Sequence, residues 1–232
     1  MRRALILPTM AACLALAATS SAQDSQAALH QKVAALKQSM AQNQQRIRHY
    51  VWTENTQLSL KGEVKSTKIE SCQYGPDGKV QKVLLSAPPD KKEARGLKKK
   101  IIENKTDDMK EYMERATALI QQYVPPPSDL VQDNLASGDT SLTPLGGDAM
   151  QIQFKNFLKG GDAVTFVVDK AAKSLRQLKV NTYLDQDKDT VDLTVDFRTL
   201  PDGTSYAAAK NLSVAAKQIV VQITTSNYQK LP

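Results

Sequence analysis

The chain has 232 residues and a formal net charge of +7 at pH 7, with 41% hydrophobic and 24% charged residues. This length suffices for one domain with a hydrophobic core, or for two small domains. The two cysteines, Cys13 and Cys72, are too few for a small fold held together by several disulfides.

The first 22 residues have the pattern of a secretory signal peptide. Arg2 and Arg3 form a charged start, residues 4–18 are almost entirely apolar, and Ser20-Ser21-Ala22 supplies the small residues that a signal peptidase recognises. The apolar run is shorter than the about 20 residues of a membrane span, and no later segment of the sequence is long and apolar enough to span a membrane. We therefore predict cleavage after Ala22 and export to the periplasm.

The two cysteines bear on anchoring and on redox chemistry. Met10-Ala11-Ala12-Cys13 loosely resembles a lipid-attachment site, so a lipoprotein anchored at Cys13 is the alternative to a cleaved chain. If Cys13 leaves with the signal peptide, Cys72 is the one remaining thiol and no internal disulfide can form. We interpret Cys72 as a small strand residue rather than a nucleophile, because a reactive thiolate needs a partner that lowers its pKa.

Residues 24–47 predict an amphipathic helix. Its apolar residues recur at helical spacing, with Gln, Lys and Arg between them, and they are Leu29, Val33, Leu36, Met40 and Ile47. One narrow apolar face indicates a helix that lies on the rest of the protein.

From residue 49 the hydrophobic period changes to two, which predicts an antiparallel meander. Extended segments at 49–60, 64–74 and 79–86 are separated by Gly- and Pro-containing sequences typical of tight turns. The apolar face of the first segment consists of Tyr50, Trp52, Leu58 and Leu60. Glu54 interrupts this face; we favour a position at the rim, with a polar point inside a cavity as the alternative, because a buried carboxylate is costly unless paired.

The middle of the chain is predicted to be helical. Residues 109–123, which include Met109 and Met113, form a strong helical stripe with Thr106 and Asp107 as candidate caps. Residues 97–102 indicate a shorter helix just before it. Three prolines at 125–127 end the helix, and residues 128–148 predict a loop with at most one short helix.

Period two returns after residue 149 and predicts strands at 150–155, 164–168, 178–184, 191–197 and 219–223. Phe154, Phe166, Leu193 and Val195 are among their apolar positions. One face of nearly every strand is apolar and the other polar, as in an antiparallel sheet packed on one side. About eight or nine strands with a helix in front and a central helical insert predict an α+β fold, in which a strongly curved sheet surrounds a common interior.

The sequence lacks the patterns of familiar catalytic sites. His30 and His49 have no cysteine or carboxylate at metal-ligand spacing, and neither a nucleophile elbow nor a phosphate-binding glycine loop occurs. We therefore expect a protein that is not an enzyme and has no cofactor.

Two charged clusters could be read as a metal site and a nucleic-acid-binding site, but we favour a simpler interpretation of each. Asp185, Asp187 and Asp189 alternate as in a calcium loop, but Thr190 stands where the loop needs glycine, which favours a solvated hairpin turn over a metal site. Lys98-Lys99-Lys100 has no aromatic residues between its charges, which favours a solvated helix face over binding of nucleic acid.

The layout resembles the periplasmic lipoprotein-carrier superfamily, the LolA/LolB-like proteins, as a diverged member. The resemblance covers nearly the whole chain after residue 22 and rests on three stretches: Tyr50-Val51-Trp52 through Gly62-Glu63-Val64-Lys65-Ser66; Phe166-Val167-Val168-Asp169-Lys170 followed by Leu175-Arg176-Gln177-Leu178; and Asn227-Tyr228-Gln229-Lys230-Leu231. It implies one domain at 23–232, an incomplete β-barrel covered by helices, and an apolar cavity that holds acyl chains. No arginine occupies a matching pattern, so no functional residue of the family is transferred.

We therefore predict a non-catalytic carrier or binding protein for a lipid, a lipoprotein or another hydrophobic ligand. Its candidate cavity residues are Tyr50, Trp52, Leu58, Leu60, Met109, Met113, Phe154, Phe166, Leu193 and Val195. The alternative is an interaction module of the cell envelope, in which the core is filled and the sheet docks a protein partner.

Overall fold

The computed structural model describes residues 31, 33–35, 37–86 and 97–231, with backbone alone for residues 97–106. The predicted signal peptide at 1–22, Cys13, Leu29, His30 and Leu36 lie outside the described residues, as do the side chains of Lys98-Lys99-Lys100. No helix in the described part combines the length and the hydropathy needed to cross a bilayer.

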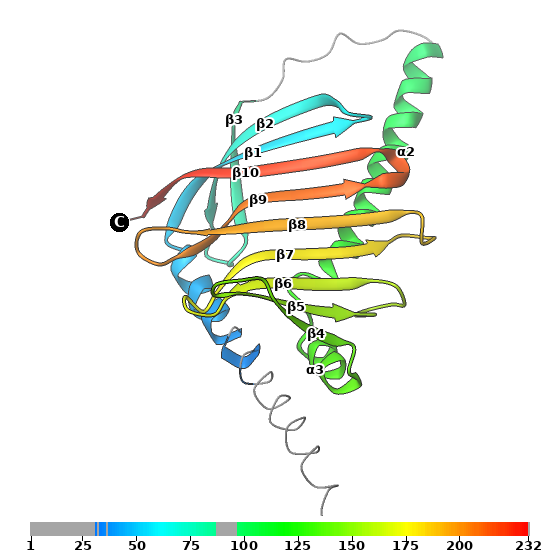
Figure 1. Ribbon diagram of the computed structural model, residues 1–232. Coiled ribbons are helices and arrows are strands. Elements are labelled where there is room, and N and C mark those ends of the chain that lie inside the picture. The colour runs from blue at the N-terminus through cyan, green and yellow to red at the C-terminus, as the bar shows by residue number, and fades with distance from the viewer. Residues whose placement is uncertain (1–30, 32, 36, 87–96, 232) are drawn as a thin grey trace, which may run out of the picture.

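A ten-stranded antiparallel sheet forms the body of the protein (Figure 1). Its strands are β1 (Tyr50–Leu60), β2 (Glu63–Tyr74), β3 (Val80–Ser86), β4 (Thr140–Pro144), β5 (Ala149–Lys155), β6 (Ala163–Asp169), β7 (Ser174–Tyr183), β8 (Thr190–Thr199), β9 (Ser205–Val214) and β10 (Ile219–Lys230). Their order is β3-β2-β1-β10-β9-β8-β7-β6-β5-β4, so the last strand returns to lie beside the first.

The helices join and cover this sheet. The N-terminal helix, described at residues 31, 33–35 and 37–47, ends just before β1. After β3, α2 (Leu97–Gln121) and α3 (Ser128–Ser137) lead the chain from the β3 edge to the β4 edge, and a short helix η1 (Ala215–Lys217) joins β9 to β10. The sheet stays open between β3 and β4, so the predicted α+β class, an incomplete barrel with a helix in front and a helical insert, is confirmed.

The main core lies between α2, α3 and the concave face of β5 to β9. Buried aliphatic and aromatic side chains of the strands, Phe154, Phe166 and Val180 among them, belong to one cluster with Tyr112 and Ala116 of α2. Just after α2, the hydroxyl of Tyr123 donates to Asp162 and lies 2.8 Å from Thr182 Oγ1, which satisfies a buried polar group inside this core.

The acidic segment between β7 and β8 is a hairpin turn that contacts α2. Tyr112 donates a hydrogen bond to Asp189, and Arg115 pairs with Asp185. Among the described residues, no group of three or more His, Cys, Asp or Glu side chains is placed to hold a metal ion. The amide of Leu184 donates to the carbonyl of Asp189 at 3.0 Å, which closes the hairpin turn predicted for this segment.

Three predictions for individual elements were wrong. The middle segment was expected to contain two helices, but α2 is continuous through Thr106 and Asp107. The predicted loop contains α3 and also β4, whose Pro144 is tolerated because β4 is an edge strand that pairs with β5. Strand β9 was missed, because three consecutive alanines and a β-bulge opposite Asp196 and Phe197 interrupt its alternation.

Candidate functional site

A pocket of 260 Å³ lies at the concave face of the sheet, beside the N-terminal helix. The edge strand β3 curls back over this face, so that its Val80 and Lys82 line the same pocket as Phe197 of β8 and Lys210 of β9. The full lining is Asn43, Gln44, Ile47, Trp52, Glu54, Tyr74, Val80, Lys82, Phe197, Ser205, Tyr206, Ala207, Lys210, Thr225 and Tyr228. Seven elements of the fold, the N-terminal helix and strands β1, β2, β3, β8, β9 and β10, therefore contribute to one site.

The N-terminal helix is held at the pocket by a pair of hydrogen bonds to the start of β9. The side-chain amide of Asn43 donates to the Ser205 carbonyl at 2.7 Å, and its Oδ1 accepts from the Ser205 amide at 2.6 Å. The Asn43 side chain thus makes the two hydrogen bonds to the Ser205 backbone that a neighbouring strand would otherwise make. Ile47 lies one helical turn after Asn43 and is buried. These contacts fix the helical wall of the pocket.

Four aromatic side chains form a second wall. Trp52 stacks on Tyr228 with ring centroids 5.7 Å apart and an interplanar angle of 11°, and Tyr74 lies 5.5 Å from Trp52. Tyr206 lies 4.3 Å from Tyr228. Because the rings pack on one another, they form a continuous apolar surface rather than an open cage around a cation. Burial raises the pKa of Tyr228 to about 12.

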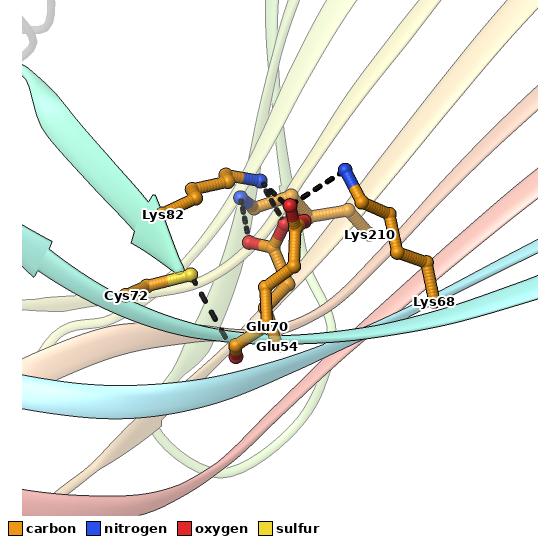
Figure 2. Close-up of polar contacts among 6 residues, drawn as sticks. All are labelled: Glu54, Lys68, Glu70, Cys72, Lys82 and Lys210. Carbon is orange, nitrogen blue, oxygen red and sulfur yellow. Dashed lines mark hydrogen bonds and ion pairs between the residues drawn. The ribbon is translucent and has the colours of Figure 1, made fainter. Parts of the chain in front are cut away.

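Charged side chains form the floor of the pocket (Figure 2). Glu54 of β1 is directly opposite Glu70 of β2, and their side chains are 3% and 7% exposed. Lys82 donates a hydrogen bond to Glu54 and lies 3.7 Å from Glu70. Burying two like charges side by side is unfavourable, and the lysines around them offset part of this cost.

Two further lysines extend this row of charges at its ends, and of these two Lys210 lines the pocket. Lys68 lies 2.6 Å from Glu70, and Lys210 Nζ lies 3.9 Å from Glu54 Oε2. The five groups alternate in charge in the order Lys68, Glu70, Lys82, Glu54 and Lys210, which we call the charge chain. Two carboxylates against three ammonium groups leave the charge chain with an excess of one positive charge.

The charge chain also shifts the pKa of its neighbours. Burial works against the charged form of Lys82, but the hydrogen bond and the negative charge of Glu54 outweigh it and raise the pKa of Lys82. Cys72 is buried in β2 beside these groups, where burial and then the charge of Glu54 raise the pKa of its thiol. This placement fits the prediction of a small strand residue.

The favoured prediction for Glu54 was wrong, because its carboxylate is buried rather than at the rim. The alternative, a polar point inside a cavity, describes what the structure shows. The partners of Glu54 could not be found in the sequence, because Lys82 and Lys210 come from strands that follow β1 at a distance and their positions depend on how β3 curls.

The predicted cavity residues are divided between two parts of the molecule, and all of them are described. Trp52 lines the pocket, whereas Tyr50 lies nearby and donates a hydrogen bond of 2.6 Å to Asp202. The others lie in or against the main core: Leu58, Leu60, Met109, Met113, Phe154, Phe166, Leu193 and Val195. The apolar face of β5 to β8 is thus covered by the helices. The open part of the concave face lies at β1 to β3 and β8 to β10.

Comparisons with known proteins return distant structural likenesses. No protein-family profile matches the sequence, and no curated protein is significantly similar to it. A crystal structure of a DUF1329 family protein from Desulfovibrio piger matches with a TM-score of 0.38 and 10% identity, over 85% of this chain and 92% of that chain. A LolA superfamily protein from Nitrosomonas europaea matches with a TM-score of 0.31 and 10% identity, over 84% of this chain and 93% of that chain.

The second of these structures belongs to the superfamily that the sequence resembles. At such TM-scores and identities, neither likeness is evidence for a ligand or an activity of this chain. The assignment of function therefore rests on the pocket.

Proposed function

We propose that the protein is a non-catalytic binding or carrier protein of the periplasm, which holds a hydrophobic or amphiphilic ligand in the pocket beside the N-terminal helix. The observation that supports this proposal is a concave site with an apolar aromatic wall and a small number of polar groups. This combination is typical of small-molecule sites in proteins.

The size of the pocket restricts what can bind. Its volume of 260 Å³ lies just below the range of about 300–1,000 Å³ that is common for ligand sites. One short alkyl chain or one part of a lipid fits this space, whereas several acyl chains together do not. Burying eight methylene-sized groups stabilises a complex by at most about 6 kcal/mol, which corresponds to a dissociation constant of tens of micromolar.

The chemistry of the described lining residues favours binding over catalysis. Both oxygens of Glu54 face ammonium groups, Oε1 that of Lys82 and Oε2 that of Lys210. Both oxygens of this carboxylate are thus directed at cations of the protein itself rather than at the open part of the pocket. The nearby thiol of Cys72 has a raised pKa and is buried, which disfavours nucleophilic attack.

The decisive experiment uses Trp52, which is the one tryptophan of the chain and lines the pocket. Titration with the neutral apolar dye N-phenyl-1-naphthylamine is expected to quench Trp52 emission by energy transfer, with saturation at one dye per chain. Ala207→Phe fills the pocket and is expected to weaken binding at least tenfold. Ala209→Phe is the matched control, because Ala209 lies in the same strand but outside the lining.

Two outcomes of this titration count against the proposal. One is a wild-type protein that does not bind the dye. The other is an Ala207→Phe variant that keeps the far-ultraviolet circular dichroism of the wild type and still binds the dye with unchanged affinity.

The periplasmic part of the proposal rests on the predicted signal peptide. Expression of the full chain is expected to yield a periplasmic protein whose N-terminal residue is Gln23. A membrane-bound product that carries lipid on Cys13 would instead support the lipoprotein alternative.

A second candidate function is supported by the edge strand β3. Every residue of β3 is exposed, including the apolar side chains of Val83, Leu84 and Leu85. An exposed apolar edge is able to pair with a strand of another protein, as an interaction module of the cell envelope would require. Native mass spectrometry after mild extraction separates the candidates: a bound small molecule supports the carrier, and a stable protein complex with an empty pocket supports the module.

A further inference from the structure

We propose that the pocket selects amphiphiles with an acidic headgroup, a carboxylate or a phosphate monoester, whose anion is held by Lys210 and Lys82 above Glu54. This inference rests on the proposed function and adds the chemical class of the ligand to it. It follows from the charge chain, the exposure of its lysines and the packing of the aromatic wall.

The first support is the charge balance at the floor of the pocket. Of the charge chain, Glu54, Lys82 and Lys210 line the pocket, and these three groups carry one excess positive charge. A ligand with a single negative charge neutralises this excess, whereas a cationic ligand adds to it. In a partly desolvated site, where charges interact more strongly than in water, this difference favours the anion.

The second support is the geometry of Lys210. Its ammonium group lies 3.9 Å from Glu54 Oε2, which is beyond hydrogen-bond distance, and its side chain is 38% exposed. A lysine ammonium has three N–H donors. Figure 2 shows Lys210 directed at Glu54. An acidic oxygen that enters the pocket therefore meets a cation that is oriented by Glu54 but makes no hydrogen bond to it.

The third support is the cost of covering these lysines. Lys82 and Lys210 are 39% and 38% exposed, so both are still partly hydrated in the empty pocket. A neutral alkyl ligand would remove that water without replacing its hydrogen bonds, which is unfavourable. An acidic headgroup replaces the lost water with charge-assisted hydrogen bonds.

The apolar part of the ligand has a separate surface to lie on. Trp52, Phe197 and Ile47 also line the pocket, and the packed rings of Trp52 and Tyr228 leave no open cage for a cationic headgroup. The site thus combines an apolar wall with a cationic floor, which is the arrangement that an anionic amphiphile requires.

The test compares four probes that share an eight-carbon chain and differ in their headgroup: octanoate, octyl phosphate, 1-octanol and octylamine. Binding of each probe to the full processed chain is measured by Trp52 fluorescence at pH 7. We expect octanoate and octyl phosphate to bind at least tenfold more tightly than 1-octanol, and octylamine to bind most weakly. Acetate and inorganic phosphate are expected not to bind at concentrations where the octyl acids saturate, which distinguishes an amphiphile site from a site for free anions.

Variants of Lys210 connect this preference to the charge chain. Lys210→Met is expected to weaken octanoate binding about tenfold and to leave 1-octanol binding unchanged, whereas Lys210→Arg keeps the preference because it keeps the charge. Lys179→Met is the matched control, because Lys179 is exposed on β7 and does not line the pocket. All variants are compared at equal folded fraction, as measured by urea unfolding.

The outcomes distinguish this inference from the proposed function. Equal affinity of the wild-type protein for octanoate and 1-octanol overturns the inferred preference for an acidic headgroup and leaves the carrier proposal standing. Failure of all four octyl probes and of the naphthylamine dye overturns the carrier proposal itself. Saturable binding of acetate or inorganic phosphate, or a Lys210→Met variant that loses octanoate and 1-octanol equally, also overturns the inference.

Discussion

Removal of the Lys82 side-chain charge is the most informative perturbation of the fold, because Lys82 contacts both buried carboxylates. Lys82→Met preserves the length of the side chain and leaves Glu54 and Glu70 facing each other across neighbouring strands. Directly opposed strand residues have Cβ atoms about 5 Å apart. Two negative charges at about that separation repel by about 3 kcal/mol at an effective dielectric constant of about 20.

The remaining lysines offset part of this repulsion. Lys68 stays 2.6 Å from Glu70, and Lys210 stays 3.9 Å from Glu54. We therefore expect Lys82→Met to lower the free energy of unfolding by about 2 kcal/mol at pH 7, somewhat less than the about 3–5 kcal/mol typical of breaking a fully buried pair. With the m-values usual in urea, the unfolding midpoint falls by about 1 M.

Urea unfolding followed by circular dichroism measures this loss against a matched control. Lys65→Met makes the same substitution in β2, at an ion pair with Glu63 that is open to solvent, and is expected to change stability by no more than about 0.5 kcal/mol. Adding Glu54→Gln to Lys82→Met is expected to restore about 1 kcal/mol, because it removes one of the two repelling charges.

The sign of that last effect is the strongest check. If Glu54→Gln destabilises the Lys82→Met variant further, then the two carboxylates do not repel each other in the folded protein. If Lys82→Met and Lys65→Met have equal effects, the charge chain behaves like a pair of surface charges and the account of the pocket floor is wrong.

Three other predictions concern ionisable groups near the pocket. The hydrogen bond from Tyr50, and after it the one from the Thr204 amide, lowers the pKa of Asp202 to about 2. Tyr50→Phe is therefore expected to raise the pKa of Asp202 toward about 3.9 in an NMR titration. In the wild type, the stabilisation by Asp202 is expected to be lost as pH falls from about 4 to about 2. Tyr228 keeps its proton to about pH 12 in the folded state, whereas an unfolded chain releases it near pH 10, so stability is expected to fall between about pH 10 and 12, and Tyr228→Phe to reduce that loss. Cys72 is expected to resist thiol reagents in the native protein and to react within minutes in urea, as peptide mapping by mass spectrometry measures; rapid native labelling would contradict its burial.

Much of the sheet could be predicted from the sequence because local patterns determine it. Gly62 and Gly78 have φ values of 79° and 75°, which glycine adopts readily, so the turns after β1 and β2 were correctly placed. The alternation of Val191, Leu193 and Val195 likewise predicted β8. Strand β9 was missed because the small side chains of Ala207–Ala209 carry almost no periodic signal, and its position depends on pairing with β8 and β10.

The pocket could not be predicted in the same way, because it depends on long-range curvature. The alternation in β1 correctly placed Trp52 and Glu54 on the same face of the sheet. This was the part of the site that could be predicted from the sequence pattern. Tyr228 lies more than one hundred residues later and reaches Trp52 through the return of β10 to β1. No local pattern indicates that Lys82, at an exposed edge strand, turns inward to the floor.

One half of the concave face is covered by apolar side chains and the other half by charged ones. This difference explains why the fold tolerates a charged site. Between α2 and β5 to β8 the inner face is apolar and filled, with Phe154, Phe166 and Val180 buried against the helix. That half supplies the hydrophobic stabilisation of the domain. Beside the N-terminal helix, in contrast, the face is lined by Glu54 and Lys82, for which apolar residues of similar volume would often give an equally or more stable protein. Stability alone therefore does not account for the charge chain, whereas selection of an acidic ligand does.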